Sequence, residues 1–481
     1  MRDKAGTQLK NSPAYPGPEI AVALAAVAMY ARTLGYDFVF DDLSLIGPEG
    51  PRWYGNATLP YRPLRYLSYW IDHLLGGGAP WAYHGANVAL HAATAVVVVR
   101  LGRRFGAGPL IAGLAGLAFA WHPLATEVAA YVSGRRDLLA TLFGLGALLS
   151  WTRRPAGATA FAVVLLLAAV ASKESGLLFL PLLFLVSALG TGPPLRVGAR
   201  TLLPAAVAMI ALPVAYGAVG PLAPVGALLD RLVVAGRLAA HYAAGLAWPV
   251  GLSVEYPSLV SSDPGGVLGI SLNAWTGIVL SASAVALIVY QLVRAKQARV
   301  AAAAAAGMFL AISLFVGSHE PGADRHAYPL VALCAVSIAE AAARSGARRR
   351  VATGVVVLAL GLVCWFAVLT NRQIPVWADQ GALWAATVRV APGSVRANHN
   401  LAGVLLESGD IDGARRALAT ARRNDPRYAP AYLGQALIDC IGGRPFRGRR
   451  WIERARARGA NPAEAAAVAE TCAQAARSGD R

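Results

Sequence analysis

The chain has 481 residues, of which 56% are hydrophobic and 15% are charged, and its mean hydropathy is +0.49. A composition this apolar excludes a soluble globular protein of this length and indicates a polytopic membrane protein. The formal net charge of +18 does not indicate nucleic-acid binding, because Arg and Lys fall mostly in short clusters between apolar segments, where basic residues set membrane topology.

Apolar segments long enough to cross a bilayer, at about 17 to 25 residues each, recur from the N-terminus to residue 370. We expect about eleven transmembrane helices, at 20–34, 81–99, 110–130, 138–151, 156–171, 176–189, 201–219, 267–293, 301–316, 327–343 and 351–370. No small-residue cleavage site follows the first segment, so we expect a retained anchor. Asp230, Arg231, Arg237 and His241 interrupt residues 225–250, which we interpret as an amphipathic or re-entrant helix on the outer side.

The basic clusters support this count. With the N-terminus inside, where Arg2, Lys4 and Lys10 lie, every basic cluster between the apolar segments falls on one side, provided that 225–250 is not counted as a span. The acidic residues gather in the opposite loops. We therefore expect a multi-pass protein of the cell (inner) membrane, with a cytoplasmic N-terminus and acid-rich extracytoplasmic loops.

The loop after the first apolar segment, residues 36–81, places two adjacent carboxylates, Asp41 and Asp42, beside a hydrophobic span. Desolvation makes a charge costly there unless the charge is used or paired, so both acids are candidates for a catalytic site. A solvated helix flank is the alternative interpretation. Arg62, Arg65 and a run of aromatic residues follow, and this combination favours a site for an anionic lipid headgroup at the bilayer surface.

Compact polar sets recur in the other outer loops. In chain order they contain His122, Glu127, Arg135, Arg136, Asp137, Lys173, Glu174, Glu255, Asp324, Arg325 and Tyr328. Each set alone is also explained by a local ion pair that caps a helix end, such as Lys173 with Glu174. Because these sets share one face, we interpret them together as the rim of a single cavity open to the outer leaflet.

The composition changes abruptly after residue 370. From Val395 the apolar residues recur with the spacing of the tetratricopeptide repeat, a helix–turn–helix unit of about 34 residues, and a weaker unit begins at Ala429. The topology places these repeats outside, on the face of Asp41 and Asp42, where they could hold a protein acceptor or act as a passive scaffold. A short array must pack against something, because each unit leaves an apolar face open.

The four cysteines, Cys334, Cys364, Cys440 and Cys472, show neither metal-site spacing nor a dense disulfide framework. Redox chemistry and structural zinc are therefore not expected. Cys440 and Cys472 can pair if their domain lies in an oxidising compartment.

A series of motifs resembles a known family. They lie at residues 38–42, 61–64, 83–91, 122–123, 126–127, 134–137, 172–175, 248–249, 252–253, 323–325, 328–329, 377 and 383–384. On these motifs the chain resembles the transmembrane and tetratricopeptide-repeat (TMTC-type) O-mannosyltransferases, membrane glycosyltransferases of the GT-C class, and heavy use of Ala, Gly and Arg suggests a bacterial member. It departs from the family in its shorter repeat region and in Ala327, where a larger residue is expected.

The resemblance implies an all-α polytopic GT-C catalytic domain over residues 1–372. A short extracytoplasmic tetratricopeptide-repeat α-solenoid over residues 373–481 is expected to follow. It further implies transfer of a sugar, expected to be mannose, from a polyprenyl-phosphate donor in the lipid bilayer to a Ser or Thr hydroxyl of a secreted or membrane protein.

Such a transfer needs a base near the acceptor hydroxyl, and Asp41 or Asp42 is placed for that role. It also needs cations on the departing lipid phosphate, for which the candidates are Arg62, Arg135, Arg136, Lys173 and Arg325. The remaining rim residues are His122, Glu127, Asp137, Glu174, Glu255, Asp324 and Tyr328. The sequence shows no clear ligand cluster, so the involvement of a divalent cation is left open.

Three alternatives differ in class. A transporter would place ionisable groups at mid-membrane within inverted repeats, and neither pattern is visible in the sequence. A non-catalytic repeat scaffold would tolerate loss of Asp41 and Asp42. A transferase that acts on a glycan or lipid acceptor would share the fold and the chemistry, so only the acceptor separates it from a protein O-mannosyltransferase.

Overall fold

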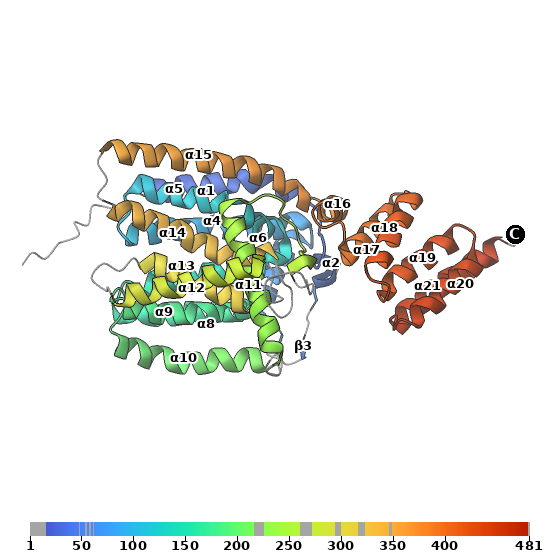
Figure 1. Cartoon of the computed structure of the whole chain (residues 1–481), viewed down its shortest axis with the longest axis horizontal. Helices are drawn as coiled ribbons and strands as arrows, with labels where there is room; N and C mark the ends of the chain where they lie inside the picture. The colour runs from blue at the N-terminus through green and yellow to red at the C-terminus, as the bar shows by residue number, and fades with distance from the viewer. Residues whose placement is uncertain are drawn as a thin grey trace, which may run out of the picture.

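A computed structural model describes residues 16–47, 49–52, 55–56, 59–60, 62–215, 226–259, 272–293, 300–315, 323–345 and 349–479. Regular structure within these ranges is almost entirely helical. A bundle of roughly parallel helices forms one part of the molecule, and a smaller group of C-terminal helices extends from one end of it (Figure 1).

A helix forms at each of the eleven segments predicted to span the membrane. They are α1 (Gly17–Tyr30), α4 (Pro80–Arg104), α5 (Pro109–Ala120), α7 (Arg135–Trp151), α8 (Ala156–Ser172), α9 (Phe179–Ala188), α10 (Leu195–Ala215), α12 (Leu272–Val293), α13 (Val300–Phe315), α14 (Tyr328–Arg344) and α15 (Arg349–Gln373). Proline opens α4 and α5 at the first helical position, where its missing N–H has no partner to lose.

Length and apolar composition confirm only part of the predicted count. Among the described residues, four helices are long and apolar enough to cross a membrane, at Pro80–Arg104, Leu272–Val293, Asp324–Arg344 and Thr353–Trp377. A fifth arises if Pro109–Ala120 and Pro123–Ala130 are one broken span, since they meet at a bend of 56°. The chain is thus multi-pass, and the count of eleven stays a prediction.

The bundle core is built from small and aliphatic side chains, which allow its helices to approach closely. Helix α4 packs against α1, α5 and α7. At Gly116 of α5, an added Cβ would lie 2.5 Å from Val99 of α4, so the contact between these helices requires glycine there.

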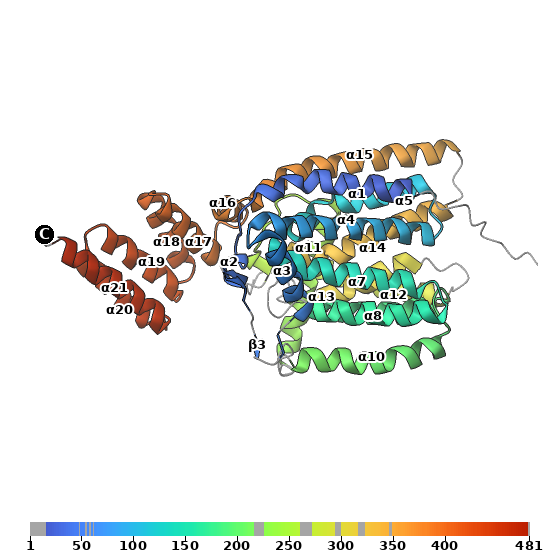
Figure 2. The same ribbon diagram turned by 180° about the vertical axis from the view of Figure 1, so that it is seen from behind.

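Helix α11 (Gly226–Ala247) runs across the other helices and packs against α12 (Figures 1 and 2). It occupies the segment that the sequence predicts to be amphipathic or re-entrant, and its crosswise direction agrees with that interpretation.

The loop that follows α1 lies at the end of the bundle from which the C-terminal helices extend (Figure 2). After η1 (Ala31–Gly35) it contains α2 (Asp42–Leu45), two antiparallel hairpins and α3 (Pro63–Gly76). The hairpins pair β1 (Ile46–Gly47) with β2 (Gly50–Pro51), and β3 (Gly55–Asn56) with β4 (Leu59–Pro60). Four of the other predicted site residues lie in short elements, Glu127 in α6 (Thr126–Ala130), Glu174 in η4 (Glu174–Leu178), and Asp324 and Arg325 in η8 (Asp324–Ala327). Three more open α7, and the short elements η2 (Pro123–Ala125), η3 (Val132–Gly134) and η5 (Pro257–Leu259) carry none.

The C-terminal region begins with η9 (Ile374–Trp377) and α16 (Gln380–Val390). Its remaining helices are α17 (Val395–Glu407), α18 (Ile411–Asn424), α19 (Ala429–Ile441), α20 (Pro445–Arg456) and α21 (Pro462–Gly479). Helices α17 and α18 pack as one pair and α19 and α20 as another, while a disulfide joins Cys440 of α19 to Cys472 of α21. Paired helices are what the repeat pattern predicts, and the tetratricopeptide assignment itself stays a prediction.

Candidate active site

The adjacent acids Asp41 and Asp42 lie in different surroundings. Asp42 is fully buried, and its Oδ1 accepts hydrogen bonds from the backbone N–H of Ser133 at 2.8 Å and from the Ser133 hydroxyl at 2.5 Å. Its Oδ2 accepts a hydrogen bond from the Val39 N–H at 3.2 Å. Burial raises the pKa of Asp42 to about 7. The Asp42 carboxylate therefore joins the loop after α1 to η3 through these hydrogen bonds.

Asp41 is half-buried, and its carboxylate accepts no hydrogen bond from the described residues. Its backbone N–H donates to the Tyr131 hydroxyl at 3.2 Å. The pKa of Tyr131 lies well above its usual value through burial, with Asp42 and Asp41 raising it further and Arg136 lowering it. Asp41 and Arg136 thus both lie within electrostatic range of Tyr131, and the Asp41 carboxylate is available for a ligand. The basic residues Arg62, Arg65, Arg136 and Lys173 are called the cationic region.

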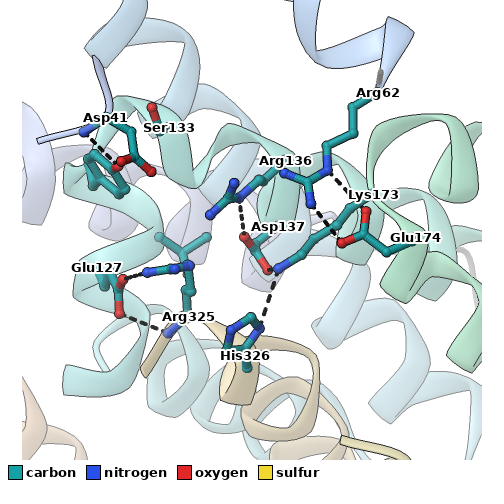
Figure 3. A network of polar contacts seen from close by, with 12 residues as sticks. Asp41, Arg62, Glu127, Ser133, Arg136, Asp137, Lys173, Glu174, Arg325 and His326 are labelled. Atoms are coloured by element: carbon teal, nitrogen blue, oxygen red, sulfur yellow. Dashed lines mark hydrogen bonds and ion pairs between the residues drawn. The ribbon is translucent and has the colours of Figure 1, made fainter. Parts of the chain in front are cut away.

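Two of the predicted phosphate-binding cations pair with predicted rim acids. Arg62 donates to both oxygens of Glu174, through Nε at 3.0 Å and Nη2 at 2.7 Å. Lys173 Nζ donates to Asp137 Oδ1 at 2.6 Å and is 3.3 Å from a ring nitrogen of His326. Figure 3 shows this network, with Arg136 between Asp41 and Lys173 in that view.

Arg136 forms an ion pair with the other carboxylate oxygen of Asp137, with its Nε 3.6 Å from Oδ2. Arg65 of α3 lies within electrostatic range of both Arg62 and Arg136. It is only 3% exposed, and its buried Nε has no hydrogen-bond partner among the described residues. A buried guanidinium without a carboxylate partner is costly, and burial together with these neighbouring cations lowers the pKa of Arg65.

Arg325 forms a buried ion pair with Glu127, in which Nη1 lies 2.5 Å from Oε1 and the Arg325 backbone N–H donates to Oε2 at 2.9 Å. This pair joins η8 to α6, although the two residues are 198 positions apart. Arg325 also lies within electrostatic range of His326 and Tyr131, so it lies at the edge of the same cationic region.

The structure assigns Arg135 a structural role and not the predicted phosphate-binding one. Its guanidinium is 1% exposed, pairs with Asp72 at 2.8 Å and donates to the Tyr83 carbonyl at 2.8 Å. It also donates to Ser68 and Asn87. These contacts use its N–H donors to hold α3 and α4 against α7.

Four predicted rim residues also have structural partners away from the cationic region. The His122 ring accepts from the Leu124 N–H and contacts the Leu246 carbonyl. The buried Tyr328 hydroxyl lies 2.8 Å from His91. Asp324 accepts from Tyr256 at 3.0 Å, and Glu255 pairs with Ser394 and Arg396 of the C-terminal region. Packing between distant segments, which the sequence does not show, explains each of these placements.

Three residues outside the predicted catalytic, phosphate-binding and rim residues contribute to the site: Ser133, His326 and Arg65, of which only Arg65 was expected near a lipid headgroup. Arg65 lies three positions after Arg62, in the loop that the sequence predicts to bind an anionic lipid headgroup, and this position is the signal that could have identified it. Ser133 and His326 gave no such signal, because their roles depend on long-range contacts. Among the described residues, no group of three or more His, Cys, Asp or Glu side chains could hold a metal ion.

Part of the chain is similar in sequence to known proteins. It is 34% identical to mouse (Mus musculus) protein O-mannosyl-transferase TMTC2 over 155 residues, which are 28% of this chain and 18% of that protein. It is 36% identical to Drosophila melanogaster Tmtc2 over 148 residues, 27% of this chain and 16% of that protein. Human (Homo sapiens) TMTC4 is 32% identical over 168 residues, 28% of this chain and 23% of that protein. The chain thus spans about a fifth of the length of these relatives.

No family model matches the chain. One solved structure, that of ArnT from Cupriavidus metallidurans bound to undecaprenyl phosphate, is similar with 15% sequence identity and a TM-score of 0.41. The similarity covers 88% of this chain and 76% of that chain.

Proposed function

We propose that this chain, a TMTC-type relative of the protein O-mannosyl-transferases, is a membrane glycosyltransferase of the GT-C class. It moves a sugar, mannose, from a polyprenyl-phosphate carrier to a Ser or Thr hydroxyl of a protein on the extracytoplasmic side. The observation that carries this proposal is a half-buried carboxylate, Asp41, near a buried group of basic residues in which Arg65 has no acidic partner among the described residues.

The basic residues of this group outnumber the acidic residues that pair with them, and the remaining positive charge suits the binding of a phosphate leaving group. Breaking the bond between the sugar C1 and the phosphate oxygen converts a phosphodiester into a phosphomonoester, so one negative charge is added to the phosphate. Arg65 is placed to receive that charge, because it has no acidic partner among the described residues, whereas Glu174 pairs with Arg62, and Asp137 pairs with Lys173 and Arg136. Cations fixed in a site with little water stabilise such a growing charge strongly.

Asp41 is the proposed base. As the acceptor oxygen bonds to C1, the hydroxyl proton moves to the Asp41 carboxylate, and the phosphate departs from the opposite face of the sugar. Direct displacement of this kind inverts the configuration at C1. The carboxylate of Asp42 cannot act in the same way, because its oxygens already accept hydrogen bonds from Ser133 and Val39.

The test uses purified protein in lipid, radiolabelled polyprenyl-phosphate mannose and a secreted-protein extract. Asp41→Asn is expected to abolish protein-bound label, while Asp37→Asn, which removes an exposed charge from the same loop, is expected to leave it unchanged. Full activity in Asp41→Asn would contradict its role as the base. Label in a lipid or glycan fraction would show that the acceptor is a lipid or a glycan and that the transfer reaction is the same. No transfer by the folded wild type would favour a non-catalytic scaffold.

A further inference from the structure

The backbone immediately before Asp41 is in a strained conformation. Phe40 has φ of 53°, which lies in the left-handed region that residues other than glycine rarely adopt. Such a conformation persists only where the surroundings hold it. What surrounds the Phe40 ring therefore decides where the next residue, Asp41, directs its carboxylate.

The Phe40 ring is enclosed by both parts of the molecule. On the bundle side it stacks on Tyr131, with ring centroids 6.1 Å apart. On the other side Trp384 of α16 meets it edge to face at 5.3 Å, and the guanidinium of Arg396 of α17 lies 5.2 Å from its centroid. Trp384 is only 2% exposed, so these are packed contacts within one hydrophobic cluster.

Further contacts fix the two parts to each other around this ring. Trp377 of η9 stacks on Tyr131 at 5.1 Å. The Asp37 N–H donates to the Ala378 carbonyl at 3.0 Å. Glu255, on the bundle side, forms an ion pair with Arg396, and this ion pair orients the Arg396 guanidinium over the Phe40 ring.

We propose that Trp384 and Arg396, which belong to the C-terminal helices, are positioning residues for the Asp41 carboxylate. They act through Phe40 and do not touch the reacting atoms. The inference rests on the proposed function for its catalytic consequence, but the conformational part stands independently. It follows that α16 and α17 are needed for catalysis itself, whatever the later repeats bind.

The kinetic test compares two arginines that contact a phenylalanine ring in the same way. Arg396→Ala removes the contact with Phe40, and Arg449→Ala removes the contact of Arg449 with the exposed Phe446, at 5.8 Å, far along the C-terminal region. We expect Arg396→Ala to lower kcat at least tenfold with the KM for the donor unchanged, Arg396→Lys to restore part of it, and Arg449→Ala to keep wild-type kcat. Wild-type kcat in Arg396→Ala, or an equal loss in Arg449→Ala, would overturn the proposal.

A second measurement does not depend on activity. Hydrogen exchange of the amides in residues 38–45, followed by mass spectrometry on the full chain in lipid, reports whether the turn is held. Trp384→Ala and Arg396→Ala are expected to accelerate this exchange at least tenfold, Trp384→Phe less, and Arg449→Ala not at all. Unchanged exchange in Trp384→Ala would overturn the inference, whereas absence of transfer in the wild type with accelerated exchange in Trp384→Ala would contradict only the proposed function.

Discussion

At the scale of single residues, the contrast between Asp41 and Asp42 shows how neighbours decide what a carboxylate can do. Both follow Phe40, yet the oxygens of Asp42 accept three hydrogen bonds from Ser133 and Val39. A carboxylate whose oxygens accept hydrogen bonds from the protein in this way stabilises the loop. The carboxylate of Asp41, which accepts none from the described residues, is the one that can take a proton from a ligand.

The role of Asp42 predicts a pH-dependent effect of Asp42→Asn on stability. Burial raises the pKa of Asp42 from 3.8 to about 7. A group whose pKa is higher in the folded state stabilises the fold most below its unfolded pKa, and this contribution is lost as pH rises through about 7. Asparagine does not titrate, and its amide would turn a donor toward the Val39 N–H, an uncompensated contact that costs about 1–3 kcal/mol.

We therefore expect Asp42→Asn to lower the unfolding temperature in detergent at pH 5, with the difference from wild type narrowing by pH 8. Asp37→Asn serves as the control, because that side chain is exposed. A difference that widens with pH would show that Asp42 is ionised in the folded protein.

Lys173 predicts the alkaline limit of activity. Burial lowers its pKa from 10.5 to about 8, and the neighbouring Asp137 only partly offsets this. Above about pH 8 the ammonium loses its proton, so the positive charge near the departing phosphate falls and the rate of transfer falls with it. Lys173→Arg keeps the charge at all these values of pH, because guanidinium does not deprotonate. The pH profile of kcat/KM is expected to extend to higher pH in the variant, and an unchanged alkaline midpoint would show that another group sets it.

At the scale of elements, the sequence predicted where helices form better than which charges meet. A helix forms at each of the eleven predicted apolar segments, because the signal is local. The ion pairs are not local: Arg62 and Glu174 are 112 positions apart, and Arg325 and Glu127 are 198 apart. Charge and loop position alone therefore grouped Arg135 with the predicted phosphate-binding residues, and only packing shows that Asp72 neutralises it.

The turn at η3 places Ser133 beside Asp42 and depends on a glycine. An added Cβ at Gly134 would lie 2.6 Å from the Val128 carbonyl oxygen and 2.9 Å from its Cα. Because both are backbone atoms, Gly134→Ala must shift η3 and is expected to destabilise the protein by about 1–3 kcal/mol and to lower transfer activity. Gly157→Ala is the matched control, since nothing lies within 4 Å of its added Cβ in α8 and alanine favours a helix by about 0.5–1 kcal/mol. Equal unfolding temperatures for the two variants would contradict this account of the turn.

At the scale of the whole molecule, the proposed chemistry requires the Asp41 face and the C-terminal helices to lie on one side of the membrane. Helix α2, which begins directly after Asp41, lies with the C-terminal helices at one end of the bundle (Figure 1). The Cys440–Cys472 disulfide supplies a chemical marker for that side, because such bonds persist in oxidising compartments and are rare in the cytosol. The other two cysteines, Cys334 and Cys364, are free.

The disulfide predicts both the topology and the stability of the C-terminal region. In cells quenched with an alkylating reagent and denatured without reductant, we expect two of the four cysteines to be alkylated, and all four only after reduction. A cytoplasmic C-terminal region would leave all four reactive from the start. Replacing Cys440 and Cys472 with serine removes a link between residues 32 positions apart, which is worth about 3–4 kcal/mol in the chain-entropy model. Limited proteolysis should then cleave α19 to α21 at lower temperature, whereas Cys364→Ser, which removes an exposed free thiol, should leave the cleavage profile unchanged.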